Sequence, residues 1–184
     1  LENIGGESCE PVSGLATQAW WAEQGDFTTL IDPKDVCSDS GNGASNFTEL
    51  VKITGNHVMK AGKKLHAVDF IIETGDIKTT MIGAVGRTLF NNEQKVEIAG
   101  SAPEILGFLR YIRNKKLIWF VEEFGSGQIR QFGSKRLAAH VKAIDSAIEA
   151  AIEGKNSVTL TIEDKQKWPA PIYAGTMSIA TDSE

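Results

Sequence analysis

The stretch from Gln94 to Gly133 changes its hydrophobic period twice, which constrains the fold more strongly than any other part of the chain. Residues 95–98 (KVEI) alternate polar and apolar side chains, as a strand with one buried face does. Apolar side chains then recur at the spacing of one helix face, at Ile105, Phe108, Leu109 and Ile112. The stretch therefore predicts a strand that leads into one short helix, over about residues 102–114.

The same stretch predicts two further strands after the helix. Residues 117–121 (LIWFV) are too few for another helix and are bulky β-formers, which indicates a strand buried on both faces. Gly125-Ser126-Gly127 predicts a turn into a hairpin strand over residues 129–132. At the start of the helix, Ser101 is the expected N-cap, and Pro103 suits the first turn.

Alternating patterns elsewhere predict more strands than helices. Two strands over residues 65–74 and 77–85, separated by a Gly75-Asp76 turn, predict a long β-hairpin. Further strands are expected over residues 17–27 and 157–163. Residues 137–144 fit a strand or a helix, and a strand is favoured because Gly133-Ser134 breaks the chain just before them. Residues 145–153 predict a helix with Asp145 as its cap.

Together these elements predict a mainly β (α+β) fold. We expect a β-sandwich or a barrel-like sheet with one flanking α-helix, a long β-hairpin, and an extended N-terminal arm and loop. Residues 1–46 are expected to form the arm, a Trp-containing strand and a long interface loop. Residues 47–180 are expected to form the sandwich domain, and residues 181–184 to fray.

Composition narrows the classes of function. The chain has 184 residues, 23% of them charged, and a net charge of -5, and it has no basic stripe of the kind that grips phosphates. Cys9 and Cys37 are too few for a disulfide framework, and the start of the chain does not resemble a signal peptide, so we expect free thiols and cytoplasmic synthesis. No apolar run approaches the roughly 20 residues that cross a bilayer, so no membrane partner is expected.

A search for catalytic or metal-binding patterns finds none that is specific. The histidines His57, His66 and His140 lack the short spacing of zinc ligands. The oxygen-rich loop over residues 31–46 does not follow the twelve-residue calcium pattern. Phosphate-binding glycine loops and serine nucleophile elbows are also missing from the sequence. The sequence therefore predicts that the protein is not an enzyme and takes no metal and no cofactor.

Large aromatic side chains offer the clearest binding candidates. Trp20 and Trp21 could stack a sugar together with Trp168, although core or subunit-interface anchors are the favoured interpretation of paired tryptophans. A loop as long as residues 31–46 within one domain is more often interfacial than idle. The predicted interface residues are Trp20, Trp21, Phe27, Asp32, Pro33, Asp35, Val36 and Trp168.

The order of elements resembles that of tail-tube (major tail) proteins of tailed bacteriophages. The likeness covers roughly residues 50–175, and its most specific parts are the helix-to-strand join at residues 102–123 and the closing segment at residues 157–175, which ends in WPAPIYAG. This resemblance implies a β-sandwich flanked by a helix, in a virion protein that is made in the host bacterial cytoplasm. It also implies hexameric rings that stack into a tube, whose hairpins line a channel for DNA without reading its sequence.

The resemblance also implies roles for particular residues. The hairpin over residues 65–85 would line the channel, with Asp69 and Glu73, or Lys78 and Thr80, facing an acidic lumen. The N-terminal arm and the loop over residues 31–46 would join adjacent rings and other tail proteins. The alternatives are another virion ring or capsid-associated component, such as a tail terminator, a baseplate ring or a head decoration, and, outside the virion, a carbohydrate-binding β-sandwich.

Overall fold

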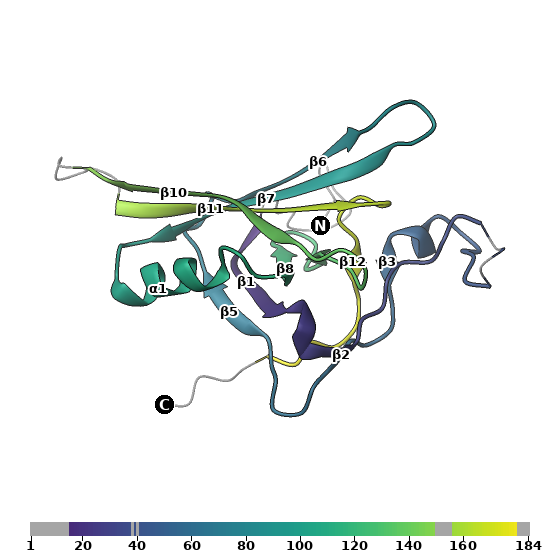
Figure 1. The fold of residues 1–184 in the computed structure, drawn as a ribbon, viewed down its shortest axis with the longest axis horizontal. Helices are drawn as coiled ribbons and strands as arrows, with labels where there is room; N and C mark the ends of the chain where they lie inside the picture. Colours follow the sequence, from purple (N-terminus) through teal and green to yellow (C-terminus); the bar gives the residue numbers. More distant parts are fainter. Residues whose placement is uncertain (1–14, 38, 40, 150–155, 180–184) are drawn as a thin grey trace, which may run out of the picture.

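The computed structural model describes residues 15–37, 39, 41–149 and 156–179. It is mainly β, with 47% of residues in strands and 11% in helices, which confirms the predicted fold class. Ten of the strands form two sheets that lie one above the other (Figure 1). A short two-stranded sheet, β2 (Phe27–Thr29) with β4 (Val58–Met59), lies below them.

The upper sheet has four antiparallel strands and contains the longest elements of the molecule. Its order is β10 (His140–Ile148), β11 (Asn156–Gln166), β7 (Leu89–Ala99) and β6 (Asp76–Ile82). The predicted strand over residues 157–163 is the centre of β11. Val158, Leu160 and Ile162 point into the core, as the alternation predicts.

The lower sheet has six strands and is covered on both faces. Its order is β3 (Lys52–Ile53), β12 (Ile172–Tyr173), β9 (Ile129–Phe132), β8 (Leu117–Glu123), β1 (Leu15–Glu23) and β5 (His66–Asp69). In β8, Leu117, Trp119 and Val121 face the core between the sheets, whereas Ile118 and Phe120 face a second apolar cluster below. The prediction of a strand buried on both faces is therefore confirmed.

The single α-helix of the described part, α1 (Pro103–Ile112), closes one end of the core between the sheets (Figure 1). Leu109 and Ile112 are buried there. Its N-cap is Ala102, which makes no side-chain capping bond, so the prediction of Ser101 as the N-cap is wrong. Pro103 occupies the first turn as predicted, because its missing N–H has no intrahelical acceptor there.

The predicted long hairpin over residues 65–85 is wrong. β5 pairs with β1 in the lower sheet, and β6 pairs with β7 in the upper sheet. The chain turns between the two sheets: Phe70 enters the core, the Ile71 N–H bonds the Glu97 carbonyl at 2.8 Å, and Ile72 is left exposed. Alternation over residues 65–74 suggested one strand because Phe70 and Ile72, two residues apart, would share a buried face, but the structure buries Phe70 and leaves Ile72 exposed.

The predicted helix over residues 145–153 is also wrong where the structure describes it. β10 continues to Ile148, with Asp145 opposite Thr159 and Ile148 opposite Asn156. Residues 150–155 lie outside the described part. Pairing with β11 outweighs the local helix propensity, which is worth only a few tenths of a kcal/mol per residue. The preference for a strand over residues 137–144 is confirmed from His140 onward.

Candidate assembly surface

The described residues contain no group of three or more His, Cys, Asp or Glu side chains that could hold a metal ion. Cys37 is an exposed free thiol. None of the helices within these residues is long and apolar enough to cross a membrane. The edges of the four-stranded sheet and a groove beside α1 offer candidate binding surfaces.

The four-stranded sheet ends in two strands, β6 and β10, and within the described part neither has a neighbour on its outer side. Each of the three pairings in this sheet is antiparallel. With four strands, β6 and β10 therefore run in opposite directions. A second copy, rotated so that its β6 lies beside β10 of the first, would continue the antiparallel order without a break.

Both of these edge strands expose apolar side chains on the face of the sheet that is turned toward the core. Met81 in β6 is 68% exposed, and Ile148 in β10 is 69% exposed. Ile77 and Ile144, from the same two strands, are half-buried against the core. Edge strands of monomeric proteins are usually protected by charges, proline or a bulge on that side. β10 carries a register shift between Val141 and Ala143, but Met81 and Ile148 still continue the apolar face of this sheet to its two edges.

The other face of the four-stranded sheet is open and polar. Glu163 lies at the centre of an ion-pair cluster, with Lys142 Nζ 2.8 Å from its Oε2 and His140 Nε2 3.6 Å from its Oε1. Burial raises the pKa of the Glu163 carboxyl, but hydrogen bonds from Lys142 and Asn91 outweigh burial and hold that pKa below its usual value. Lys142 also contacts Glu93.

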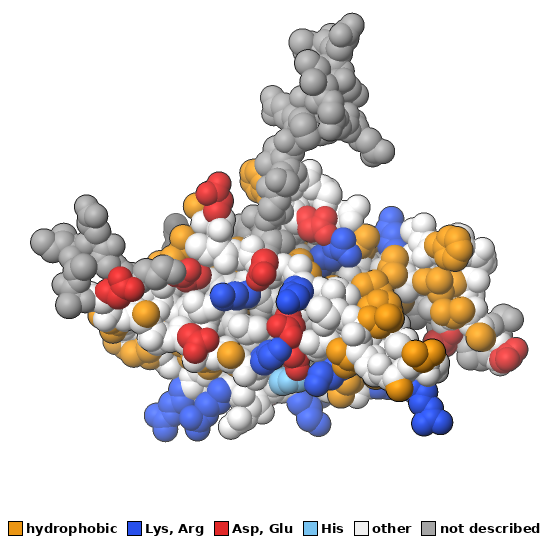
Figure 2. All heavy atoms as spheres, turned by 90° about the horizontal axis from the view of Figure 1, so that it is seen from above, with side chains coloured by type: hydrophobic (Ala, Val, Ile, Leu, Met, Phe, Trp, Pro, Cys, Tyr) orange, Lys and Arg blue, Asp and Glu red, His pale blue; other side chains and the backbone are white. Residues whose placement is uncertain are grey.

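Charges of both signs are mixed over this open face (Figure 2). Its acidic side chains are Asp76, Glu93, Glu97, Asp145 and Glu163, and its lysines are Lys78, Lys95, Lys142 and Lys165. Hydrophobic side chains gather at the right-hand end in the figure, the end from which the β6–β7 hairpin projects. The face therefore carries little net charge, unlike the acidic lumen that the resemblance implies.

A buried polar network ties the four-stranded sheet to the lower sheet. Asn92 Nδ2 donates to Asp164 Oδ1 at 2.9 Å, and the Gly133 N–H donates to Asp164 Oδ2 at 2.7 Å. Burial raises the pKa of the Asp164 carboxyl, although hydrogen bonds from Gly133, Asn92 and Gln166 partly offset this. Because Asp164 belongs to β11 and Gly133 follows β9, this carboxylate fixes the two sheets relative to each other.

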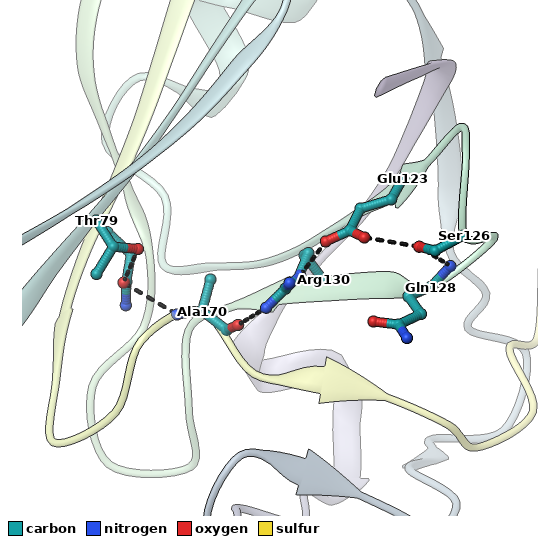
Figure 3. Close-up of polar contacts among 7 residues, drawn as sticks. Thr79, Glu123, Ser126, Gln128, Arg130 and Ala170 are labelled. Carbon is teal, nitrogen blue, oxygen red and sulfur yellow. Dashed lines mark hydrogen bonds and ion pairs between the residues drawn. The ribbon is translucent and has the colours of Figure 1, made fainter. Parts of the chain in front are cut away.

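The segment that precedes β12 extends this connection. Figure 3 shows Ala170 between the sheets: its N–H donates to Asn92 Oδ1 at 3.0 Å, and its carbonyl accepts from Arg130 Nη1 at 3.0 Å. Thr79 Oγ1, from β6, also donates to Asn92 Oδ1 at 2.9 Å. Arg130 is held in turn by Glu123. The β6 edge is thus anchored to the body of the molecule.

A second surface is an apolar groove of about 600 Å³ between α1 and β5. Trp21, Phe70 and Ile98 form its floor, and Ile105 and Phe108 form its helical wall. The carboxylates that line it are Asp69 and Glu104. In α1, Leu109 and Ile112 are buried in the core, whereas Ile105 and Phe108 remain half-exposed and line the groove with Glu104.

The structure separates the four predicted lumen residues. Lys78 and Thr80 lie on the open face of β6, opposite Glu93 and Asn91 of β7. Asp69 lies at the end of β5 in the lower sheet, where its Oδ1 accepts from Gln18 Nε2 at 2.7 Å. Glu73 lies in the turn between the sheets with a φ of 64°. These residues do not form one lining.

The predicted interface residues also divide into two groups. Trp20 and Trp21 in β1, and Phe27 in β2, are each less than 9% exposed within a single copy, and the small exposed part of Trp21 lies in the groove beside α1. Pro33 is buried, Asp32 and Asp35 are half-buried, and Val36 is 81% exposed, on the loop that follows β2. Trp168 is half-buried, and its carbonyl accepts from Asn92 Nδ2 at 3.2 Å.

Sequence reasoning missed the surfaces that involve Met81, Ile148, Ile105 and Phe108. The apolar residues themselves were visible, but which strands are edges depends on pairings between distant segments. No protein-family model, curated protein or solved structure matches this chain. Its function is therefore inferred from its own geometry and from the resemblance in its order of elements.

Proposed function

We propose that this chain is a structural protein that assembles with copies of itself into closed rings, and that these rings build a bacteriophage tail tube. The observation that carries the proposal is the pair of oppositely directed edges, β6 and β10, which have no outer neighbour among the described residues and expose Met81 and Ile148 on the core side. Pairing of β6 with β10 of the next copy satisfies the backbone groups of both edges and covers both side chains.

One register fits both faces of the joined sheet. Residues 77–82 of one copy lie antiparallel to residues 143–148 of the next, with Ile77 opposite Ile148 and Met81 opposite Ile144. These pairs continue the apolar core face across the boundary. On the open face, Lys78 then lies diagonally across from Asp145, within reach of a long side chain.

The contact joins two different edges, so it is heterologous and repeats around an axis until the ring closes. Six copies, the number that the resemblance implies, would each contribute four strands. Closed sheets of about 16–18 strands already enclose an aqueous channel, so a closed sheet with the strands of six copies would also enclose an open channel. The six-stranded sheet and α1 cover the core face, and the polar face is therefore the one that lines the channel.

The channel lining suits passage of DNA rather than binding. Lys142 and Lys165 are paired with Glu163, and the acidic side chains of this face outnumber its lysines, so the lining does not attract phosphates strongly. Lys78 and Thr80 would face the channel, whereas Asp69 and Glu73 would not. The protein would act in the virion tail, after assembly in the host cytoplasm, with other tail proteins as its further partners and no membrane.

Assembly of the purified full-length chain tests this proposal. We expect negative-stain electron microscopy to reveal annular particles with a central channel, and sedimentation velocity to detect a discrete ring species. Lys78→Asp and Asp145→Lys should each weaken ring formation, and the double variant should restore it. A protein that remains monomeric up to its solubility limit would contradict the proposal.

A further inference from the structure

We infer that the tip of the β6–β7 hairpin is a docking element that inserts into the apolar groove beside α1 of a copy in the next ring. This inference rests on the proposed self-assembly, and it adds a contact between rings to the edge pairing within a ring. It departs from the expectation that the N-terminal arm and the loop over residues 31–46 join the rings.

The hairpin tip has a defined shape. The Arg87 N–H bonds the Ala84 carbonyl at 2.9 Å, which closes a tight turn, and Gly83 and Gly86 supply the positive φ values of 100° and 81°. A Cβ on Gly83 would lie 2.6 Å from the Arg87 carbonyl oxygen, so the turn is as tight as glycine permits. A preorganised tip loses little conformational freedom when it binds.

This turn presents an apolar side chain beside a positive charge. Val85 is fully exposed, and Arg87 makes no ion pair with any described residue. The hairpin projects beyond the rest of the molecule (Figure 1). Within a single copy Val85 stays in water, whereas a groove in a neighbour would bury it.

The groove is complementary to the tip in both respects. Its floor and helical wall are apolar, and Glu104, in the first turn of α1, is exposed at its rim without a described ion-pair partner. Asp69 adds a second carboxylate. A valine in the groove and an arginine at the rim therefore match its apolar interior and its acidic edge.

The positions of tip and groove decide how the two copies are related. The tip precedes Leu89 at the start of β7, and the groove is lined by Ile98 and Ala99 at the end of the same strand. An 11-residue strand separates its ends by roughly 35 Å. Insertion therefore joins copies displaced along the strand direction. Such a contact is heterologous and need not close, so it extends a tube rather than a ring.

The ends of this chain fit the groove less well. Residues 1–14 contain Glu2, Glu7 and Glu10 and no lysine or arginine, and residues 180–184 contain Asp182 and Glu184. An acidic rim would repel both segments. Among the exposed apolar side chains, Val85 combines full exposure with an arginine two residues away that makes no ion pair with any described residue. We therefore assign the groove to the hairpin tip of a second copy.

Charge reversal tests the assignment in the full-length protein. Negative-stain microscopy and sedimentation should find that Arg87→Glu loses tubes but keeps rings. The double variant Arg87→Glu with Glu104→Arg should regain tubes. Val85→Asp should lose them as well. Lys60→Glu is the matched control, because it reverses an exposed charge in another turn, and its tubes should resemble those of the wild type.

Several outcomes would overturn this inference while leaving ring assembly intact. The first is that the Arg87→Glu protein forms tubes as long as those of the wild type. The second is that the single variant loses tubes and the double variant fails to regain them. Loss of the rings themselves in Arg87→Glu, with unchanged folding by circular dichroism, would place the tip within a ring and overturn its role between rings. Wild-type protein without any assembly would overturn both proposals.

Discussion

Replacing Ile148 by asparagine separates the folding of one copy from the association of copies. Ile148 is 69% exposed at the end of β10, so the substitution removes little burial within a single copy. Surface substitutions of this kind usually change the free energy of unfolding by no more than about 0.5 kcal/mol. In the proposed ring the same side chain lies opposite Ile77 of the next copy and leaves water.

The size of the effect on assembly follows from the exposed fraction. Full burial of an isoleucine side chain stabilises by about 1.5–3 kcal/mol. About two-thirds of that remains to be gained when β10 pairs, which is roughly 1–2 kcal/mol for each interface. At 1.4 kcal/mol per factor of ten, Ile148→Asn should raise the dissociation constant of each interface by roughly 5–30-fold.

Sedimentation velocity over a dilution series measures this change, and thermal unfolding of dilute protein reports on the single copy. Phe124→Asn is the control, because Phe124 is 59% exposed in the turn between β8 and β9, away from both edges of the four-stranded sheet. It should leave ring formation unchanged. If the Ile148→Asn protein assembles at the same protein concentration as the wild type, the edge-pairing argument is refuted, whatever the shape of the wild-type particle.

Three further predictions concern the fold. Gly133→Ala should lower the free energy of unfolding, measured by chemical denaturation, by about 3 kcal/mol or more, because the φ of Gly133 is 90° and a Cβ there would lie 2.7 Å from the Leu117 carbonyl oxygen. Gly62→Ala is the control: Gly62 has a φ of 76° but lies in open space, so this substitution should cost only about 1–2 kcal/mol. Glu163→Gln should flatten the loss of stability in acid, since the lowered pKa of Glu163 contributes stability that disappears as pH falls through that value. Burial lowers the pKa of His57, so an NMR titration of His57 should have its midpoint below the usual histidine range. The free energy of unfolding should also decrease as the pH falls through the usual histidine range, because the unfolded chain then binds a proton that folded His57 does not.

Patterns that depend on local burial could be predicted from the sequence. The alternation at residues 95–98 and 157–163, the helix face at residues 105–112 and the run at residues 117–121 all lie where the structure buries one or both faces. These segments are central to the sheets or packed on the core, so their side-chain periods directly record which side is buried.

Pairing between distant segments could not be predicted in the same way. Residues 65–74 and 77–85 are adjacent in sequence and separated by a turn, which favours a hairpin, yet β5 finds β1 and β6 finds β7. The edges of the sheets follow from these pairings, so the candidate surfaces were also hidden. The sequence also does not reveal that Asn92 and Asp164, which are far apart in the chain, hydrogen-bond each other in the interior.

The exposed apolar edges raise a problem that the proposed assembly resolves. Unpaired strands with exposed isoleucine and methionine side chains are sites of uncontrolled aggregation. In this sheet the open face of the same two strands carries Lys78 and Asp145, whose opposite charges attract when β6 meets β10 but repel when either strand meets a copy of itself. The charges thus favour the one pairing that continues around a ring. The double variant Lys78→Gln with Asp145→Asn neutralises both charges and leaves the apolar contact in place. We therefore expect negative-stain microscopy to find irregular aggregates in place of regular rings. A double variant that still forms only rings would contradict this role of the charges.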